Sequence, residues 1–164
     1  MQKEYEQLLG IIPDHPAQRI MHFVDRHTPL VDALSELTRT REYEYLLLAF
    51  DAEAARTLAQ RFALSPHISV KPVTHDQARY HRQAKMYDFV FVEAAIPDPA
   101  AFLRRAYPAI KNAGTLLMLS PDPDLNIDAW REGMEEHYYV AFSTFELDGD
   151  TQVISGKKMH GWGG

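Results

Sequence analysis

Apolar residues in this chain form short unbroken runs separated by amphipathic stretches. The run Phe89–Val92 consists of β-branched and aromatic residues, and within Tyr87–Pro97 it is followed by an acid, small residues and a proline. A strand that is apolar on both faces belongs inside a sheet covered by helices. Ligands bind to such sheets in the crevice beyond the carboxyl ends of the strands. We therefore expect Glu93–Asp98 to border any functional site.

Similar patterns predict further strands along the chain. These are 19–25, 43–50, 68–73, 115–119, 138–147 and 151–159, although a helical turn fits the first nearly as well. Pro72 predicts an edge position for the third strand, because proline has no backbone N–H to donate. Asp148-Gly149-Asp150 is typical of a tight hairpin turn and pairs the last two strands.

Helical spacing of apolar positions, together with capping residues, predicts the elements between the strands. Thr28, Asp51 and Asp98 are expected N-caps, and prolines follow the first and last of them. A polar helix is expected from Thr74 or Asp76 to about Arg82. The expected helices cover 2–10, 29–40, 52–63, 76–82, 99–111 (divided at Pro108 and ended by Asn112–Gly114) and 125–137.

Strands that alternate with helices and finish in an antiparallel hairpin predict an α/β fold. We expect a doubly wound, mostly parallel, seven-stranded Rossmann-like sheet. The length of 164 residues suits a single domain, residues 1–164, with an ordinary hydrophobic core.

The composition excludes several classes of binding partner and of site. A net charge of −6 argues against a general nucleic-acid binder, which needs a basic face. Disulfides and thiolate metal sites are excluded because the chain has no cysteine. Neither a signal peptide nor a membrane span is indicated, so a soluble cytoplasmic protein is expected. The basic stretch 79–85 suits either an anionic ligand or a solvated helix face, and the acidic balance favours the second.

The segment Tyr87–Leu119 resembles the fourth strand, helix and fifth strand of the class I S-adenosylmethionine (SAM)-dependent methyltransferases. Ile110-Lys111-Asn112-Ala113-Gly114 stands where that family has a Leu-Lys-Pro-Gly-Gly turn. The ending, Phe145–Lys158, looks like the hairpin of small-molecule O-methyltransferases. The resemblance implies a methyltransferase-like fold, SAM as the cofactor and a small-molecule substrate.

The first loop departs from the family pattern. The family cradles SAM with a glycine-rich turn, because glycine lets the backbone approach a ligand closely. The corresponding Asp25–Pro29, DRHTP, has no glycine, and the Arg and His side chains are expected to fill the pocket. Two hypotheses remain. The protein is a methyltransferase that binds SAM in an altered way, or it is a non-catalytic binding module that has lost SAM. The second predicts a protein partner or a homodimer, with the N-terminal helix and Trp162 as candidate contacts.

The resemblance also names candidate cofactor-binding residues. Asp25 and His27 lie in the first loop, Asp51 matches the acid that binds the ribose, Asp76 the acid near the adenine, and Glu93 the acid that closes the fourth strand. For Asp51 and Asp76 the alternative is a helix N-cap, which we favour.

A magnesium site is the other chemistry that the resemblance suggests. Metal-dependent O-methyltransferases hold a divalent cation with acids and an amide after the fourth and fifth strands, and Glu93, Asp122, Asp124 and Asn126 stand there. The alternative, solvated acids in a Pro-rich loop, is favoured, so we predict no metal and assign no catalytic residue.

Overall fold

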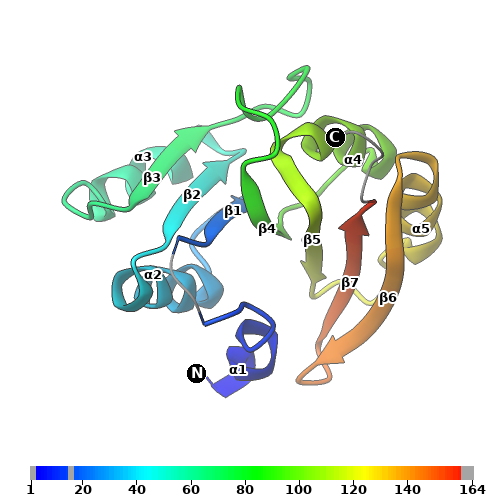
Figure 1. Ribbon diagram of the computed structural model, residues 1–164, viewed down its shortest axis with the longest axis horizontal. Helices are drawn as coiled ribbons and strands as arrows, with labels where there is room; N and C mark the ends of the chain where they lie inside the picture. The colour runs from blue at the N-terminus through cyan, green and yellow to red at the C-terminus, as the bar shows by residue number, and fades with distance from the viewer. Residues whose placement is uncertain (1–2, 15–16, 160–164) are drawn as a thin grey trace.

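A computed structural model describes residues 3–14 and 17–159, and it contains a seven-stranded sheet in the order β3-β2-β1-β4-β5-β7-β6 (Figure 1). Strands β1 to β5 are parallel, while β7 runs antiparallel to both β5 and β6. The predicted α/β fold, with its final hairpin, is confirmed. The strands are β1 Arg19–Val24, β2 Glu44–Ala49, β3 Ile68–Pro72, β4 Tyr87–Glu93, β5 Ile110–Ser120, β6 Tyr139–Leu147 and β7 Thr151–Lys158.

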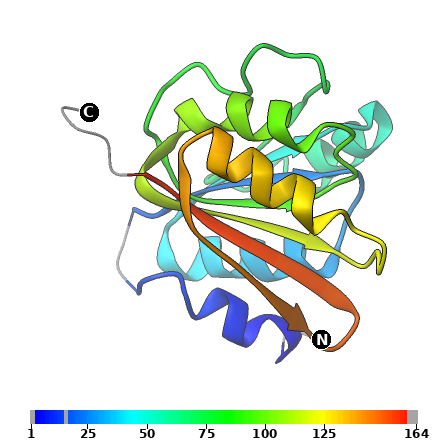
Figure 2. The same ribbon diagram turned by 90° about the vertical axis from the view of Figure 1, so that its right-hand side faces the viewer.

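Helices cover both faces of this sheet, with α1 and α2 on one side and α4 and α5 on the other (Figure 2). Each side has its own apolar core, because the inner strands are buried on both faces. The helices are α1 Lys3–Leu9, α2 Pro29–Arg41, α3 Ala52–Arg61, α4 Pro99–Ala106 and α5 Ile127–Glu136. No helix of the described residues has the length and apolar character needed to cross a membrane.

Several local predictions are confirmed. Thr28, Asp51 and Asp98 accept a backbone N–H in the first turn of α2, α3 and α4, as expected of N-caps. Strand β3 lies at the edge of the sheet, and 19–24 is a strand rather than a helical turn. Asp148 and Gly149 both have positive φ angles, of 56° and 73°, as a two-residue hairpin turn requires.

The polar helix expected over 76–82 is wrong, because the chain from Thr74 to Met86 is an irregular loop. Gln77 accepts the Thr74 N–H, which closes a turn at the place where the helix should begin. Tyr80 is the one large apolar side chain of this loop that is buried, and it packs edge-on against Phe23. A single aromatic anchor holds a loop to the core, whereas a helix needs an apolar stripe.

The helix expected over 99–111 is also too long. The observed helix, α4, ends at Ala106, a 3₁₀ turn follows over Tyr107–Ala109, and β5 begins at Ile110. The residues Asn112–Gly114, expected to end the helix, lie inside β5. These residues do interrupt the regular strand, since Ala113 has a φ of 65° and the pairing register between β5 and β4 shifts beside them. Trp162, a suggested contact residue, lies outside the described residues.

Candidate functional site

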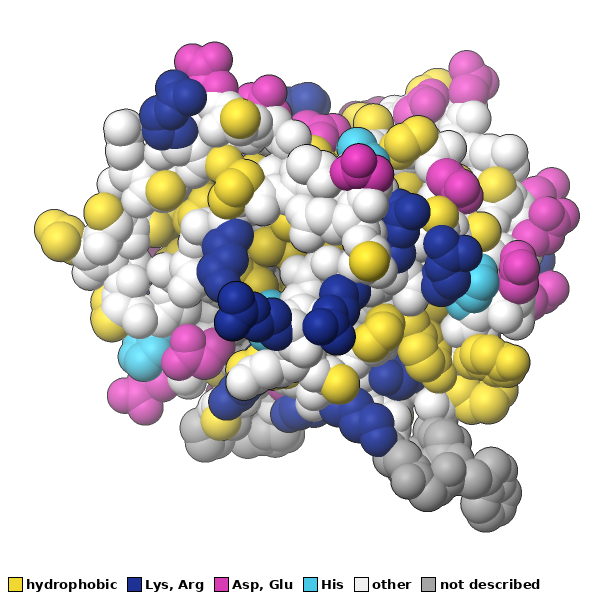
Figure 3. Space-filling model, turned by 90° about the horizontal axis from the view of Figure 1, so that it is seen from above, with side chains coloured by type: hydrophobic (Ala, Val, Ile, Leu, Met, Phe, Trp, Pro, Cys, Tyr) yellow, Lys and Arg dark blue, Asp and Glu magenta, His cyan; other side chains and the backbone are white. Residues whose placement is uncertain are grey.

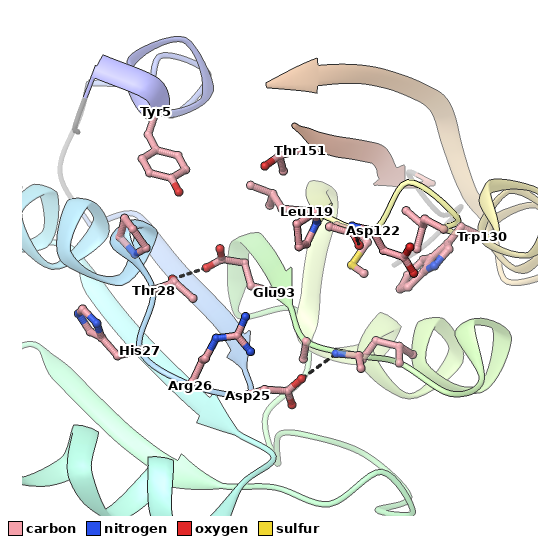
Figure 4. A pocket seen from close by; sticks show the side chains of 18 residues that line it. Tyr5, Asp25, Arg26, His27, Thr28, Glu93, Leu119, Asp122, Trp130 and Thr151 are labelled. Carbon is pink, nitrogen blue, oxygen red and sulfur yellow. Dashed lines mark hydrogen bonds between the residues drawn. The ribbon is translucent and has the colours of Figure 1, made fainter. Parts of the chain in front are cut away.

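A cavity of about 570 Å³ opens at the carboxyl ends of β1, β4 and β5 (Figure 4). The loops after these three strands supply most of its wall, and Tyr5 of α1, Trp130 of α5 and Thr151 of β7 complete it. The predicted segment Glu93–Asp98 contributes Glu93–Ile96 to this wall. The cavity therefore lies where a parallel sheet is expected to bind its ligands.

A chain of hydrogen bonds runs from the core to the floor of this cavity. His22 is fully buried, and its Nδ1 lies 2.6 Å from the Tyr45 hydroxyl. Its Nε2 lies 2.7 Å from Oε1 of Glu93, which also accepts a 2.6 Å bond from the Thr28 hydroxyl. An ionised carboxylate only accepts, so Nε2 carries a proton and, in the neutral ring, Nδ1 accepts from Tyr45. Each of the four side chains in this network thus has a hydrogen-bond partner.

This hydrogen-bond network keeps the Glu93 carboxyl group ionised inside the protein. Burial acts to raise the pKa of this carboxyl, but the hydrogen bonds from His22 and Thr28 and the nearby charge of Arg26 outweigh it and hold the pKa below its ordinary value. Burial raises the pKa of the Tyr45 hydroxyl well above its ordinary value, and the Glu93 charge adds to this. The Glu93 carboxylate therefore lines the cavity as an anion that is hydrogen-bonded to His22 and Thr28.

The first loop gives the cavity its cationic wall. The Arg26 side chain extends into the hollow beside Glu93 (Figure 4), as the missing glycines predicted. His27 does not fill the hollow, because its Nε2 lies 3.0 Å from Oδ1 of Asp32 at the rim. Asp25 accepts the Ala95 N–H at 2.8 Å and so ties the loop after β1 to the loop after β4.

Asp51 and Asp76 do not line this cavity, whereas Asp25, His27 and Glu93 do. Asp51 is exposed and accepts the Ala54 N–H at 2.9 Å as the cap of α3. Asp76 is exposed too, and a hydrogen bond from the Thr74 hydroxyl lowers the pKa of its carboxyl. The structure thus gathers three of the five predicted cofactor residues at one hollow.

Aromatic side chains fill the space at the carboxyl ends of β2 and β3. The Phe50 ring stacks on His75 with 3.9 Å between ring centroids, and Tyr80 packs edge-on against Phe50. Arg105 donates to the His75 carbonyl oxygen and closes the same region. The hollow beside His75 and Tyr80 measures only about 20 Å³.

The residues considered for magnesium have local structural partners. Asn126 caps α5 by accepting the Ala129 N–H at 3.1 Å. Asp122 accepts the Asp124 N–H at 2.9 Å within the loop after β5. Over residues 3–14 and 17–159, no group of three or more His, Asp or Glu side chains is placed to hold a metal ion.

Sequence reasoning missed the buried network. His22 was visible only as the one polar residue inside an otherwise apolar strand, RIMHFV. A fully buried histidine needs partners for both ring nitrogens, so this position could have signalled a network. Its partners Tyr45 and Glu93 come from other strands, at sequence separations of 23 and 71 residues, and only the sheet order brings them together.

Comparisons with known proteins give a likeness of fold. A scan against protein-family models and a search of curated proteins gave no match. Among solved structures, the CMeT domain of the citrinin polyketide synthase has a TM-score of 0.75 at 13% identity, over 98% of this chain and 52% of that one. A SAM-dependent O-methyltransferase of Thermotoga maritima has a TM-score of 0.74 at 11% identity, over 99% and 67%.

A third match is a Haloferax volcanii complex between the Trm112 methyltransferase activator and a methyltransferase candidate. Its TM-score is 0.72 at 13% identity, over 97% of this chain and 90% of that one. The chain spans about half the length of several of its matches, with 51% and 52% as examples. With its strand order and final hairpin, the chain has the class I SAM-dependent methyltransferase fold.

Proposed function

We propose that this domain is a non-catalytic binding module that keeps the methyltransferase fold and does not bind SAM. The observation that carries the proposal is the position of Arg26. Its side chain occupies the hollow beside Glu93, on the loop where the family has glycines that admit the cofactor. Fold alone does not imply activity, so the residues of the crevice decide the question.

The first loop is also built in a way that resists opening. Thr28 is both the N-cap of α2 and a donor to Glu93, and Pro29 fixes the backbone after it. Glu93, whose Oε1 accepts from both His22 and Thr28, is engaged inside the protein. A cofactor entering along this loop would have to displace contacts that hold the fold together.

The nucleoside half of SAM meets a second obstacle. The resemblance assigns the ribose and adenine to acids at Asp51 and Asp76, but neither borders the cavity of about 570 Å³. The stacked Phe50 and His75 rings lie at that end of the sheet. The residues present therefore do not fit SAM held in the manner of the family.

The cavity itself suits another occupant. Arg26 supplies a positive charge and Glu93 a negative one, while Ser120 and Thr151 supply hydroxyls around partly apolar walls. A polar small molecule, or a polar side chain of a protein partner, matches this mixed lining. The Haloferax volcanii match, a complex with an activator, supports a protein partner.

A SAM-dependent methyltransferase of small molecules is the second candidate. The open cavity at the carboxyl ends of the strands favours it, and so do the matches to enzymes of this kind. In that case the cofactor would be held differently from the way the family holds it, with Asp25, His27 and Glu93 as the contact residues.

Calorimetric titration with S-adenosylhomocysteine, the product of SAM-dependent methyl transfer, tests the proposal. We expect no heat and no thermal stabilisation up to millimolar ligand, with an active methyltransferase as the positive control. Micromolar binding that Asp51→Ala abolishes would overturn the proposal and establish a cofactor site of the family type. Micromolar binding that depends instead on Arg26 or His27 would favour the second candidate.

A further inference from the structure

Basic side chains form a band at the end of the sheet opposite the crevice. Three hollows, of about 210, 630 and 480 Å³, lie in series from β3, at the edge of the sheet, to the amino ends of β4 and β5. The first two share Arg19 and the last two share Lys111, so they are neighbours. We call the five Lys and Arg residues that line these hollows the basic band: Lys71, Arg19, Lys85, Lys111 and Lys157.

The band concentrates positive charge on an acidic protein. The acids that line the three hollows are Glu44 and Asp88, against the five cations, while the whole chain has a net charge of −6. Glu44 lies 2.9 Å from His67, and Asp88 lies 3.1 Å from Lys111 and accepts the Arg19 N–H. Figure 3 shows Lys and Arg side chains gathered over the middle and lower edge of one side, with acids toward its margins. The three hollows therefore carry a local excess of positive charge.

Lys85 of the band lies close enough to Lys158 for their positive charges to oppose each other. Lys158, beside the band, donates to the carbonyl oxygens of Tyr107 and Ile110 at 3.0 and 2.9 Å. Burial lowers the pKa of its ammonium group, and the charge of Lys85 lowers it further. An anion bound along the band would relieve this repulsion, which favours anionic partners.

The length of the band indicates an extended ligand. Its residues come from β3, β1, the loop before β4, β5 and β7, which spans five strand-to-strand steps of the sheet order. At about 4.8 Å a step this is roughly 24 Å, the length of about seven residues of extended peptide. A single phosphate or carboxylate would fill only one of the three hollows.

The chemistry of the lining favours a peptide over a nucleic acid. Tyr45, Tyr87 and Phe89 are buried, and His81, the other ring that lines the hollows, packs edge-on against Tyr87, so these rings offer no platform for bases. The net charge of −6 also repels a polyanion as dense as DNA or RNA more than it repels a few carboxylates. Ile11, 45% exposed, lies in the hollow with Lys111 and Lys157. An apolar residue of a bound peptide, next to the peptide's acidic residues, would therefore contact Ile11.

We propose that the basic band is the docking site for an extended acidic segment of a partner protein. The proposal is independent of the crevice and of whether the domain binds SAM. Lysine predominates in the band, and its ammonium group pairs with carboxylates as a point charge without fixed geometry. Recognition by such a surface depends on the number and spacing of acids more than on their identity, and it weakens with added salt.

Fluorescence anisotropy with the whole chain tests this site. The probe is a labelled peptide of about nine residues with alternating Glu and Ser, long enough to span the band. We expect saturable binding that weakens as salt is added. Reversing two exposed band charges, Lys85→Glu with Lys157→Glu, should weaken binding by about tenfold or more. Arg56→Glu with Arg104→Glu, a double reversal of equal charge at exposed positions of α3 and α4 that line none of the three hollows, should change it by less than about twofold.

Three outcomes would overturn the proposal. One is the absence of binding to the peptide at millimolar concentration. Another is an equal loss of affinity in the two double variants, which change the net charge by the same amount, because that would mean that net charge alone attracts the probe. The third is tighter binding of a short DNA or RNA duplex than of the peptide, with the same dependence on Lys85 and Lys157. That outcome would assign the band to nucleic acid.

Discussion

Nε2 of His22 and Oε1 of Glu93, 2.7 Å apart, join the middle of β1 to the last residue of β4. The parallel register pairs Val24 with Glu93 and His22 with Phe91, so the two partners are diagonal neighbours on one face of the sheet. This contact fixes the carboxylate at the floor of the crevice. It also makes the position of this crevice residue depend on a buried core residue.

Removing the ring of His22 should cost stability. His22→Leu leaves the Tyr45 hydroxyl without its buried acceptor and the Glu93 carboxylate with the Thr28 hydroxyl as its remaining donor, and we expect a loss of about 1–3 kcal/mol in the free energy of unfolding. Urea denaturation at neutral pH measures it. His67→Leu is the control, since the exposed His67–Glu44 pair should contribute less than about 1 kcal/mol. Equal losses in the two variants would contradict the prediction.

The ionisation of Glu93 should make stability depend on pH. The pKa of Glu93 in the folded protein lies below its ordinary value of 4.5, so the stabilisation is complete above that pH and is lost as the pH falls through the folded pKa. Glu93→Gln removes this contribution. The difference in unfolding free energy between wild type and Glu93→Gln should therefore shrink below about pH 4.5.

Urea midpoints measured between neutral pH and about pH 3 test this dependence. Glu132→Gln, at an exposed position of α5, should run parallel to the wild type over the same range. A constant difference between wild type and Glu93→Gln would show that the carboxylate does not titrate with folding.

The architecture was predictable because each strand has its own local signal. The continuous apolar run of β4, the proline near the end of β3 and the Asp-Gly turn before β7 each depend on a few adjacent residues. The wrong predictions concern two segments whose conformation is determined by tertiary contacts. The loop 74–86 is held by the burial of Tyr80, and Asn112–Gly114 form an irregularity inside a strand rather than a turn after a helix.

The site was predictable only in part, for the same reason. Sheet topology placed the crevice beside Glu93, and the missing glycines placed a side chain in it. What the sequence could not indicate is which side chain turns inward. Arg26 extends into the hollow, whereas His27 is held at its rim by Asp32, a residue of the following helix. That choice depends on partners that only the folded chain supplies.

Tyr80 should carry the stability of the irregular loop. Its ring is 6% exposed and packs against Phe23, Phe50 and Phe102. Tyr80→Ala should lose about 3–5 kcal/mol of unfolding free energy, and Tyr80→Phe about 1 kcal/mol for its interaction with Arg105. Urea denaturation gives both values.

Limited trypsin digestion tests the local part of this prediction. Arg79 and Arg82 are exposed in the same loop, so Tyr80→Ala should speed cleavage there more than at exposed Arg56 on α3. Uniform acceleration at all three sites would mean that Tyr80 supports the core as a whole and not the loop.

Two glycines should respond to substitution for different reasons. A Cβ on Gly114 would lie 2.6 Å from Cγ2 of Ile110 and 2.8 Å from the Lys111 carbonyl oxygen, so Gly114→Ala forces β5 to shift at a cost of about 1–3 kcal/mol. Gly149 has open space around it but a φ of +73°, and Gly149→Ala should cost about 1–2 kcal/mol through backbone strain. Gly149→Asn should cost less than Gly149→Ala, because asparagine adopts positive φ more readily than alanine. Urea denaturation of the three variants separates the effect of crowding at Gly114 from the effect of backbone strain at Gly149. If Gly149→Asn loses as much stability as Gly149→Ala, the positive φ angle is not the cause of the loss at this position.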